Sequence, residues 1–139
     1  MLSITTISTL LVSLLVTTTI AAPTENPLDK RAALTCDLKG GKYRPVDEVQ
    51  ECVDWLLANK ANIDCVVEGE STVFCQNYNT VVTGYNNGTK ESVSSLCRDV
   101  ADAAQVIVDT CTTPAGYVGG QNTAVGNGNM IITIDRRSE

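Results

Sequence analysis

The sequence contains no histidine, and this absence removes several kinds of chemistry at once. A Ser-His-Asp triad and a Cys-His pair both need an imidazole base. Zinc sites rely on histidine or on closely spaced cysteine pairs, and the chain has no Cys-x-x-Cys motif. We therefore expect no metal, no cofactor and no catalytic residues. Paired carboxylates can still carry out acid–base chemistry, so a small enzyme remains an alternative.

Basic residues and long apolar runs are also scarce. Lys and Arg together number 10 against 16 Asp and Glu, which gives a net charge of −6. Proteins that bind nucleic acids usually carry a basic patch, and none is visible in this sequence. After the N-terminal segment, no apolar run approaches the length of about 20 residues that a membrane-spanning helix needs. We expect neither a nucleic-acid partner nor an integral membrane segment in the mature form.

The first part of the chain predicts secretion followed by processing. Residues 1–21 have a polar start, an apolar core and a small-residue end, as a cleaved signal peptide does. Residues 22–31 then form a short polar propeptide that ends at Lys30-Arg31. This pair is of the kind cut by the dibasic protease of the fungal secretory pathway, although such pairs can also be ordinary solvated charges. We predict one extracellular mature domain over residues 32–139.

Cysteine is the residue type that the predicted mature domain uses most distinctively. An even number of cysteines in a short secreted chain is typical of a disulfide framework. A core of this size is marginal alone, and each disulfide can add roughly 2–4 kcal/mol. The pairing stays open, but bridges between helices and strands are preferred because they would tie both helices to the sheet. The six residues are Cys36, Cys52, Cys65, Cys75, Cys97 and Cys111.

Apolar periodicity predicts two helices and several strands. One helical stripe, from Val49 to Leu57, belongs to a helix that ends near Lys60, and a second helix runs from Thr89 to Cys111. The strands of Cys65 and Cys75 are expected to form a hairpin. The predicted fold is an α+β two-layer sandwich with two helices on one face of an antiparallel sheet, order β-α-β-β-α-β-β, stapled by disulfides. The predicted strands cover 33–38, 63–67, 71–75 and 80–85. A last hairpin joins 116–120 to 130–134, and the strand of residues 130–134 is expected in the interior of the sheet.

Two surface elements are candidate contacts. Trp55 lies off the centre of the first apolar stripe, so it either packs along the helix edge or presents an exposed anchor for a partner. The polar loop of residues 122–129 either carries contacts on a rigid scaffold or only turns the chain. Its candidate contact residues are Asn122, Asn127 and Asn129.

The sequence also contains one acceptor pattern for N-glycosylation. Asn87-Gly88-Thr89 fits the Asn-x-Thr motif and lies in a predicted exposed turn. We expect Asn87 to carry a glycan when the protein passes through a eukaryotic secretory pathway.

The second half of the chain resembles the carboxyl-terminal half of the fungal killer-toxin-like effectors. These are small secreted cysteine-rich proteins that include smut killer toxins and necrosis-inducing extracellular effectors. The resemblance covers about Cys36 to Ile134 and implies a sandwich of two helices on an antiparallel sheet. It is carried by Cys97-Arg98-Asp99-Val100-Ala101, Ile107-Val108-Asp109-x-Cys111, Gly119-Gly120-Gln121-Asn122 and Gly126-Asn127-Gly128-Asn129 before Met130-Ile131-Ile132-Thr133-Ile134.

Three functions follow from these observations as hypotheses. The first is a secreted fungal effector or killer-toxin-like virulence protein that binds a target of a host or competing microbe without catalysis. That target would be a protein or a component of the cell wall or cell surface. The second is a small apoplastic enzyme or enzyme inhibitor. The third is a structural protein associated with the wall of the fungus itself.

Overall fold

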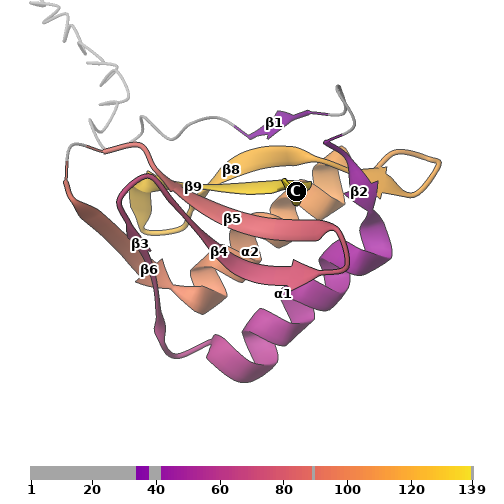
Figure 1. Ribbon diagram of the computed structural model, residues 1–139. Helices are drawn as coiled ribbons and strands as arrows, with labels where there is room; N and C mark the ends of the chain where they lie inside the picture. Colours follow the sequence, from indigo (N-terminus) through magenta and orange to yellow (C-terminus); the bar gives the residue numbers. More distant parts are fainter. Residues whose placement is uncertain (1–33, 38–41, 89, 139) are drawn as a thin grey trace, which may run out of the picture.

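The computed structural model describes residues 34–37, 42–88 and 90–138 (Figure 1). The predicted signal peptide, the propeptide and Lys30-Arg31 lie outside these residues. Two helices pack against the same face of an antiparallel sheet (Figure 1). The prediction of an α+β fold with two helices on a disulfide-stapled antiparallel sheet is confirmed.

The central sheet has five strands in the order β1-β8-β9-β5-β4. Strand β9 therefore lies in the middle of the sheet, as predicted for residues 130–134. Two further ladders join β2 to β7 and β3 to β6. The elements in chain order are β1 (Thr35–Cys36), β2 (Arg44–Pro45), α1 (Val46–Lys60), β3 (Asp64–Glu68), β4 (Ser71–Asn77), β5 (Thr80–Asn86), β6 (Ser92–Leu96), α2 (Cys97–Cys111), β7 (Tyr117–Val118), β8 (Gly120–Ala124) and β9 (Asn127–Arg136).

Strands β3 to β6 form one bent ribbon instead of the predicted hairpin. β3 pairs with β6, and β4 pairs with β5. At the bend, the Gly69 N–H donates to the Glu91 carbonyl at 3.0 Å, and the Asn86 N–H donates to the Glu70 carbonyl at 2.9 Å. The expectation that the strands of Cys65 and Cys75 pair with each other is therefore wrong. The turn between them redirects the chain from one ladder to the other.

The second helix begins later than predicted. Residues 92–96, expected in its first turns, form β6, so the sequence prediction of helix from Thr89 is wrong. Four strands consequently separate the helices, one more than the three segments predicted there, 63–67, 71–75 and 80–85. No side chain caps α2 at Leu96; instead, the Cys97 N–H donates to the Ile63 carbonyl at 2.9 Å. A distant backbone group thus satisfies one of the free donors at the helix start.

The core lies between the helices and the sheet. On α1 the buried positions follow the predicted stripe but stop at Leu56, since Leu57 is 41% exposed. The stripe of α2 is longer and contains small residues that let the helix approach the sheet. The core-facing residues of α2 are Cys97, Val100, Ala101, Ala103, Ala104, Ile107, Val108 and Cys111, and those of the sheet include Val82, Met130, Ile132 and Ile134.

Every disulfide joins a helix to a strand. Cys36 on β1 pairs with Cys111 on α2, Cys52 on α1 with Cys75 on β4, and Cys65 on β3 with Cys97 on α2. This is the arrangement that the sequence analysis preferred. Three such bridges are consistent with an extracellular protein, because disulfides persist in oxidising compartments.

Candidate functional site

A hollow opens beside Trp55, between α1 and the outermost strand β4. Its volume is about 290 Å³. Trp55 is 44% exposed, so part of the residue packs and part remains open to solvent. The Cys52–Cys75 disulfide joins the two elements at the hollow itself. The lining residues are Glu51, Cys52, Trp55, Phe74, Cys75, Gln76 and Asn77.

Three neighbouring residues lie around Trp55. The Asn59 side-chain amide donates to the Trp55 carbonyl at 2.9 Å, within the last turns of α1. Lys60 Nζ lies 5.9 Å from the centroid of the Trp55 ring, within the range of a cation–π contact. The Phe74 ring, half-buried against the core, forms part of the hollow. The Asn59 bond holds the backbone of Trp55, and Lys60 contacts the indole ring itself.

A second exposed aromatic residue stands at the turn that follows the hollow. Tyr78 is 76% exposed and has a φ of 50°, a left-handed conformation that is uncommon for a large side chain. Gln76 Nε2 donates to the Tyr78 carbonyl at 3.4 Å. Asn77 Nδ2 donates to the Glu48 carbonyl at 3.2 Å and to Glu51 Oε2 at 2.6 Å. The two Asn77 bonds tie the turn to α1.

The sequence analysis did not single out Tyr78. The available signal was an aromatic residue between two asparagines, Asn77-Tyr78-Asn79, at the junction of two β-prone segments. Asparagine tolerates turn conformations, so the pattern marks a tight turn. It does not show that the aromatic ring faces solvent.

A network of polar side chains lies next to this turn. Arg44 Nε donates to the buried Thr80 hydroxyl at 3.0 Å, and Arg44 Nη2 lies 3.2 Å from Glu48 Oε2. The Thr80 hydroxyl in turn donates to Glu48 Oε2. The three residues belong to β2, β5 and α1. The network therefore fixes the end of the sheet that carries Tyr78 relative to α1.

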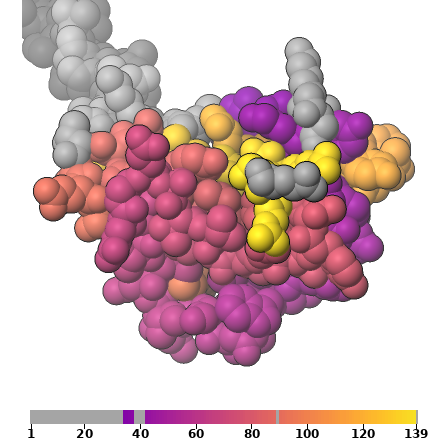
Figure 2. Space-filling model, viewed as in Figure 1, coloured from indigo at the N-terminus to yellow at the C-terminus, as the bar shows by residue number. Residues whose placement is uncertain are grey.

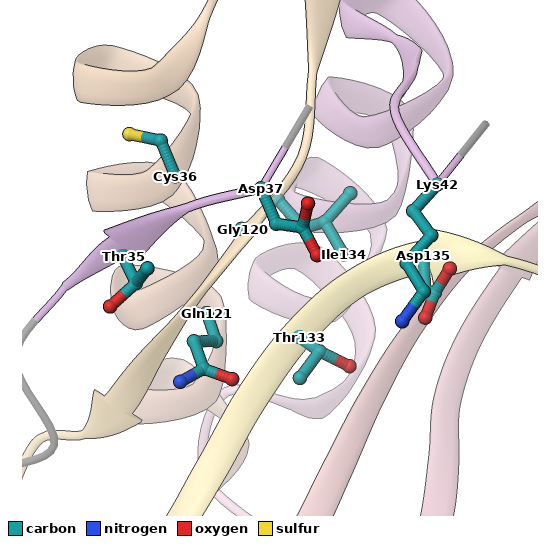
Figure 3. A pocket seen from close by; sticks show the side chains of 9 residues that line it. All are labelled: Thr35, Cys36, Asp37, Lys42, Gly120, Gln121, Thr133, Ile134 and Asp135. Carbon is teal, nitrogen blue, oxygen red and sulfur yellow. The ribbon is translucent and has the colours of Figure 1, made fainter. Parts of the chain in front are cut away.

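The face of the sheet that points away from the helices carries a larger groove with more charged residues (Figure 3). Its volume is about 570 Å³, and Asp37, Lys42 and Asp135 contribute charged side chains to its lining. Thr35, Gln121 and Thr133 form a row across β1, β8 and β9, because Thr35 pairs with Gln121 and Gln121 with Thr133. Thr133 Oγ1 is buried and has no hydrogen-bond partner within the described part of the chain.

The C-terminal end of β9 continues past this groove. In Figure 2 the residues at this end, in yellow, lie over the pink strands of the β4–β5 ribbon. Arg136 is the last residue of β9 and pairs with Thr80, and the Arg137 N–H donates to the Asn79 carbonyl at 2.8 Å. The last described residues are therefore bonded to the end of the sheet that carries Tyr78.

Residues 122–129, predicted as a loop, are mostly strand. β8 extends to Ala124 and β9 begins at Asn127, so only a two-residue turn separates them. Asn122 Nδ2 donates to the Ala103 carbonyl at 3.4 Å, and Asn127 Nδ2 donates to the Ser94 carbonyl at 2.6 Å. Both side chains therefore bond to backbone carbonyls of the protein itself. The Asn129 residue is exposed, and its contact role stays a prediction.

The structure does not bring Trp55 together with that turn. Trp55 lies beside β4, whereas the β8–β9 turn contacts β6, where Ser95 Oγ donates to the Val125 carbonyl at 3.2 Å. The two contact candidates therefore belong to separate surfaces. Of these, the Trp55 surface has a hollow lined by two aromatic residues, Trp55 and Phe74.

Asn87 is exposed, which a glycosylation acceptor requires. The Asn87 N–H donates to the Asn129 carbonyl at 2.8 Å, and the Gly88 N–H donates to Asn86 Oδ1 at 3.0 Å. Both bonds use the Asn87–Gly88 backbone and leave the Asn87 side chain on the surface. Thr89 lies outside the described residues, and glycosylation of Asn87 stays a prediction.

Within residues 34–37, 42–88 and 90–138, no group of three or more His, Cys, Asp or Glu residues is placed to hold a metal ion. Neither helix in this part of the chain has the length and apolarity needed to cross a membrane. No curated protein and no solved structure matches the chain. Residues 31–136 match a family described as a domain of unknown function (DUF8794), and the chain therefore belongs to this family.

Proposed function

We propose that the protein is a secreted fungal effector or killer-toxin-like protein that acts by binding a target of a host or a competing microbe. The observation that carries this proposal is the exposed Trp55 beside a hollow braced by the Cys52–Cys75 disulfide. A large aromatic residue is a common anchor of binding surfaces. A contact that is rigid before binding loses less entropy on association.

Three observations support secretion. The N-terminal pattern is that of a signal peptide followed by a dibasic pair. The family match begins at residue 31, next to the predicted processing site. All six cysteines are paired, which suits an oxidising compartment. The fold of two helices on an antiparallel sheet is compatible with the killer-toxin-like resemblance.

The lining of the hollow favours recognition over catalysis. Glu51 is its single ionisable group, because both cysteines form a disulfide and the other lining residues are neutral. General acid–base hydrolysis at one site usually employs two carboxyl groups with different roles. A protein or a component of a cell wall or cell surface is therefore a more suitable ligand for this hollow than a substrate.

The enzyme hypothesis has one observation in its favour. Asp37 and Asp135 line the same groove on the opposite face of the sheet. If this groove hydrolyses a wall polysaccharide, Asp135→Asn should abolish turnover while leaving the fold intact. Release of reducing sugars from plant and fungal wall preparations would reveal such turnover, and its loss in Asp135→Asn would replace the binding proposal.

Replacement of Trp55 by alanine tests the proposal. The purified variant should retain the melting temperature of the natural protein and lose the response of host leaves on infiltration or of competitor cells in growth assays. Leu57→Ala is the matched control, because Leu57 is 41% exposed on the same helix but does not line the hollow. A full response from Trp55→Ala would reject the proposal. Loss of both response and stability would assign Trp55 a packing role.

A further inference from the structure

We infer that the hollow beside Trp55 binds a sugar ring of a neutral oligosaccharide. This inference rests on the proposed function and names the ligand class of the same surface. It follows from the kinds of side chain that line the hollow, from their charge, and from the shape of the neighbouring strand edge.

The hollow combines the two kinds of contact that a sugar ring needs. A pyranose ring presents apolar C–H groups on its faces and hydroxyl groups around its rim. Trp55 and Phe74 supply aromatic surface, and Asn77 and Glu51 supply polar groups. Sites for small ligands typically show this combination of apolar lining with a few polar groups that fix orientation.

The polar groups are held in place before any ligand binds. Asn77 Nδ2 donates to both the Glu48 carbonyl and Glu51 Oε2, at 3.2 Å and 2.6 Å. These bonds use the amide nitrogen of Asn77 and one carboxylate oxygen of Glu51. Their remaining oxygens are hydrogen-bond acceptors, suited to the hydroxyl groups of a sugar.

Charge selects a neutral sugar over an acidic one. Glu51 is the single ionisable group of the lining, and the whole chain has a net charge of −6. An acidic polysaccharide would meet repulsion from both. The nearby cation, Lys60, already lies 5.9 Å from the Trp55 ring centroid, so its ammonium group interacts with the indole.

The edge of β4 argues against an extended peptide as the ligand. A peptide that adds a strand needs a regular row of free backbone groups. The register of β4 against β5 shifts between Val73 and Cys75, beside the hollow. A bulge of this kind bends the strand and protects a sheet edge from pairing.

The experiment uses the single tryptophan of the chain as the probe. Trp55 fluorescence of the mature protein is titrated with chitin, β-glucan and mannan oligosaccharides, each as a purified fragment of several sugar units. We expect a saturable change in emission with at least one of the three. Glu51→Ala should weaken that binding by about tenfold, the loss of one well-placed hydrogen bond. Tyr85→Ala is the control: Tyr85 is 42% exposed and lines a different hollow, so its affinity should equal that of the natural protein.

Two results would overturn the inference. One is the absence of any saturable change with all three oligosaccharides in protein of native circular dichroism. The other is equal affinity of the Glu51→Ala variant and the natural protein. Loss of cell response in Trp55→Ala without sugar binding would remove the inference and leave the proposed function. Saturable sugar binding without any host or competitor response would support the inference and reject the proposed function.

Discussion

The ring of Phe74 on β4 occupies the space in front of Gly84 on β5. A Cβ atom at position 84 would overlap this ring and lie 2.9 Å from Val67 Cγ2. The glycine is therefore required for close approach and not for a left-handed backbone. Phe74 also lines the hollow beside Trp55. The absence of a side chain at Gly84 therefore allows Phe74 to take its position in the wall of the hollow.

Gly84→Ala should lower the free energy of unfolding by about 1–3 kcal/mol, because the added methyl group forces Phe74 out of its position. Displacement of Phe74 should also change the fluorescence of Trp55. Urea denaturation followed by circular dichroism measures the first effect, and emission of the native state the second. Gly128→Ala is the control, since nothing lies within 4 Å of a Cβ there. Natural stability together with natural emission in Gly84→Ala would contradict this account.

The three disulfides should differ in their reaction with a reductant. Cys36 is exposed, whereas Cys52, Cys65 and Cys97 are each at most 5% exposed. Thiol–disulfide exchange requires access to a sulfur atom. We therefore expect the Cys36–Cys111 bridge to open first at low reductant concentration under native conditions. Alkylation followed by peptide mapping checks the order. Earlier labelling of Cys52 or Cys65 would contradict it.

The sequence correctly predicts the parts of the fold that depend on residues close together in the chain. The apolar stripe of α1 and the central strand around Ile132 follow from periodicity alone, because each buries one face. The end of α2 at Cys111 was also predicted, from the Thr112-Thr113-Pro114 sequence that follows it.

The errors fall where distant segments decide the structure. Val93 and Leu96 continue the helical spacing of α2, yet they lie on β6 because β3 supplies a pairing partner. The first N–H of each helix also bonds to a remote carbonyl: Val46 to Gly116 and Cys97 to Ile63. Neither partner is visible in a local window. The same applies to the hollow, since the surroundings of Trp55 depend on which strand lies beside α1.

The two dibasic pairs should have different fates during secretion. Lys30-Arg31 precedes β1, the first strand, which begins at Thr35, whereas Arg136 pairs with Thr80 inside the sheet. A protease needs an extended, unpaired substrate, so strand pairing protects Arg136-Arg137. After enzymatic removal of the N-glycan, the intact mass of the secreted protein should correspond to Ala32–Glu139. A start near Pro23 would reject processing at Lys30-Arg31, and loss of Ser138-Glu139 would reject protection of the second pair.

Asn87 should carry a glycan when the protein is secreted from a eukaryotic host. The residue is exposed, and the bonds of its neighbourhood involve the backbone. Treatment with an N-glycosidase should increase gel mobility and convert Asn87 to aspartate, which peptide mass spectrometry detects. Asn87→Gln is the matched variant and should migrate like the deglycosylated protein. Unchanged mobility of the natural protein after treatment would contradict this prediction.

Alanine substitutions of the two asparagines that flank Gly128 should separate effects on stability from effects on target recognition. Asn127 Nδ2 donates to the Ser94 carbonyl, and its Oδ1 accepts from the Asn129 N–H at 3.1 Å. Asn127→Ala should therefore cost about 0.5–1.5 kcal/mol per lost bond, with no change in cell response at temperatures where the variant is folded. Asn129 makes its bonds through the backbone, so Asn129→Ala should keep the natural melting temperature. If the β8–β9 turn contacts the target, this second variant alone should lose response at full stability. If both variants respond as the natural protein does, the turn only connects the strands, and recognition depends on the separate surface around Trp55.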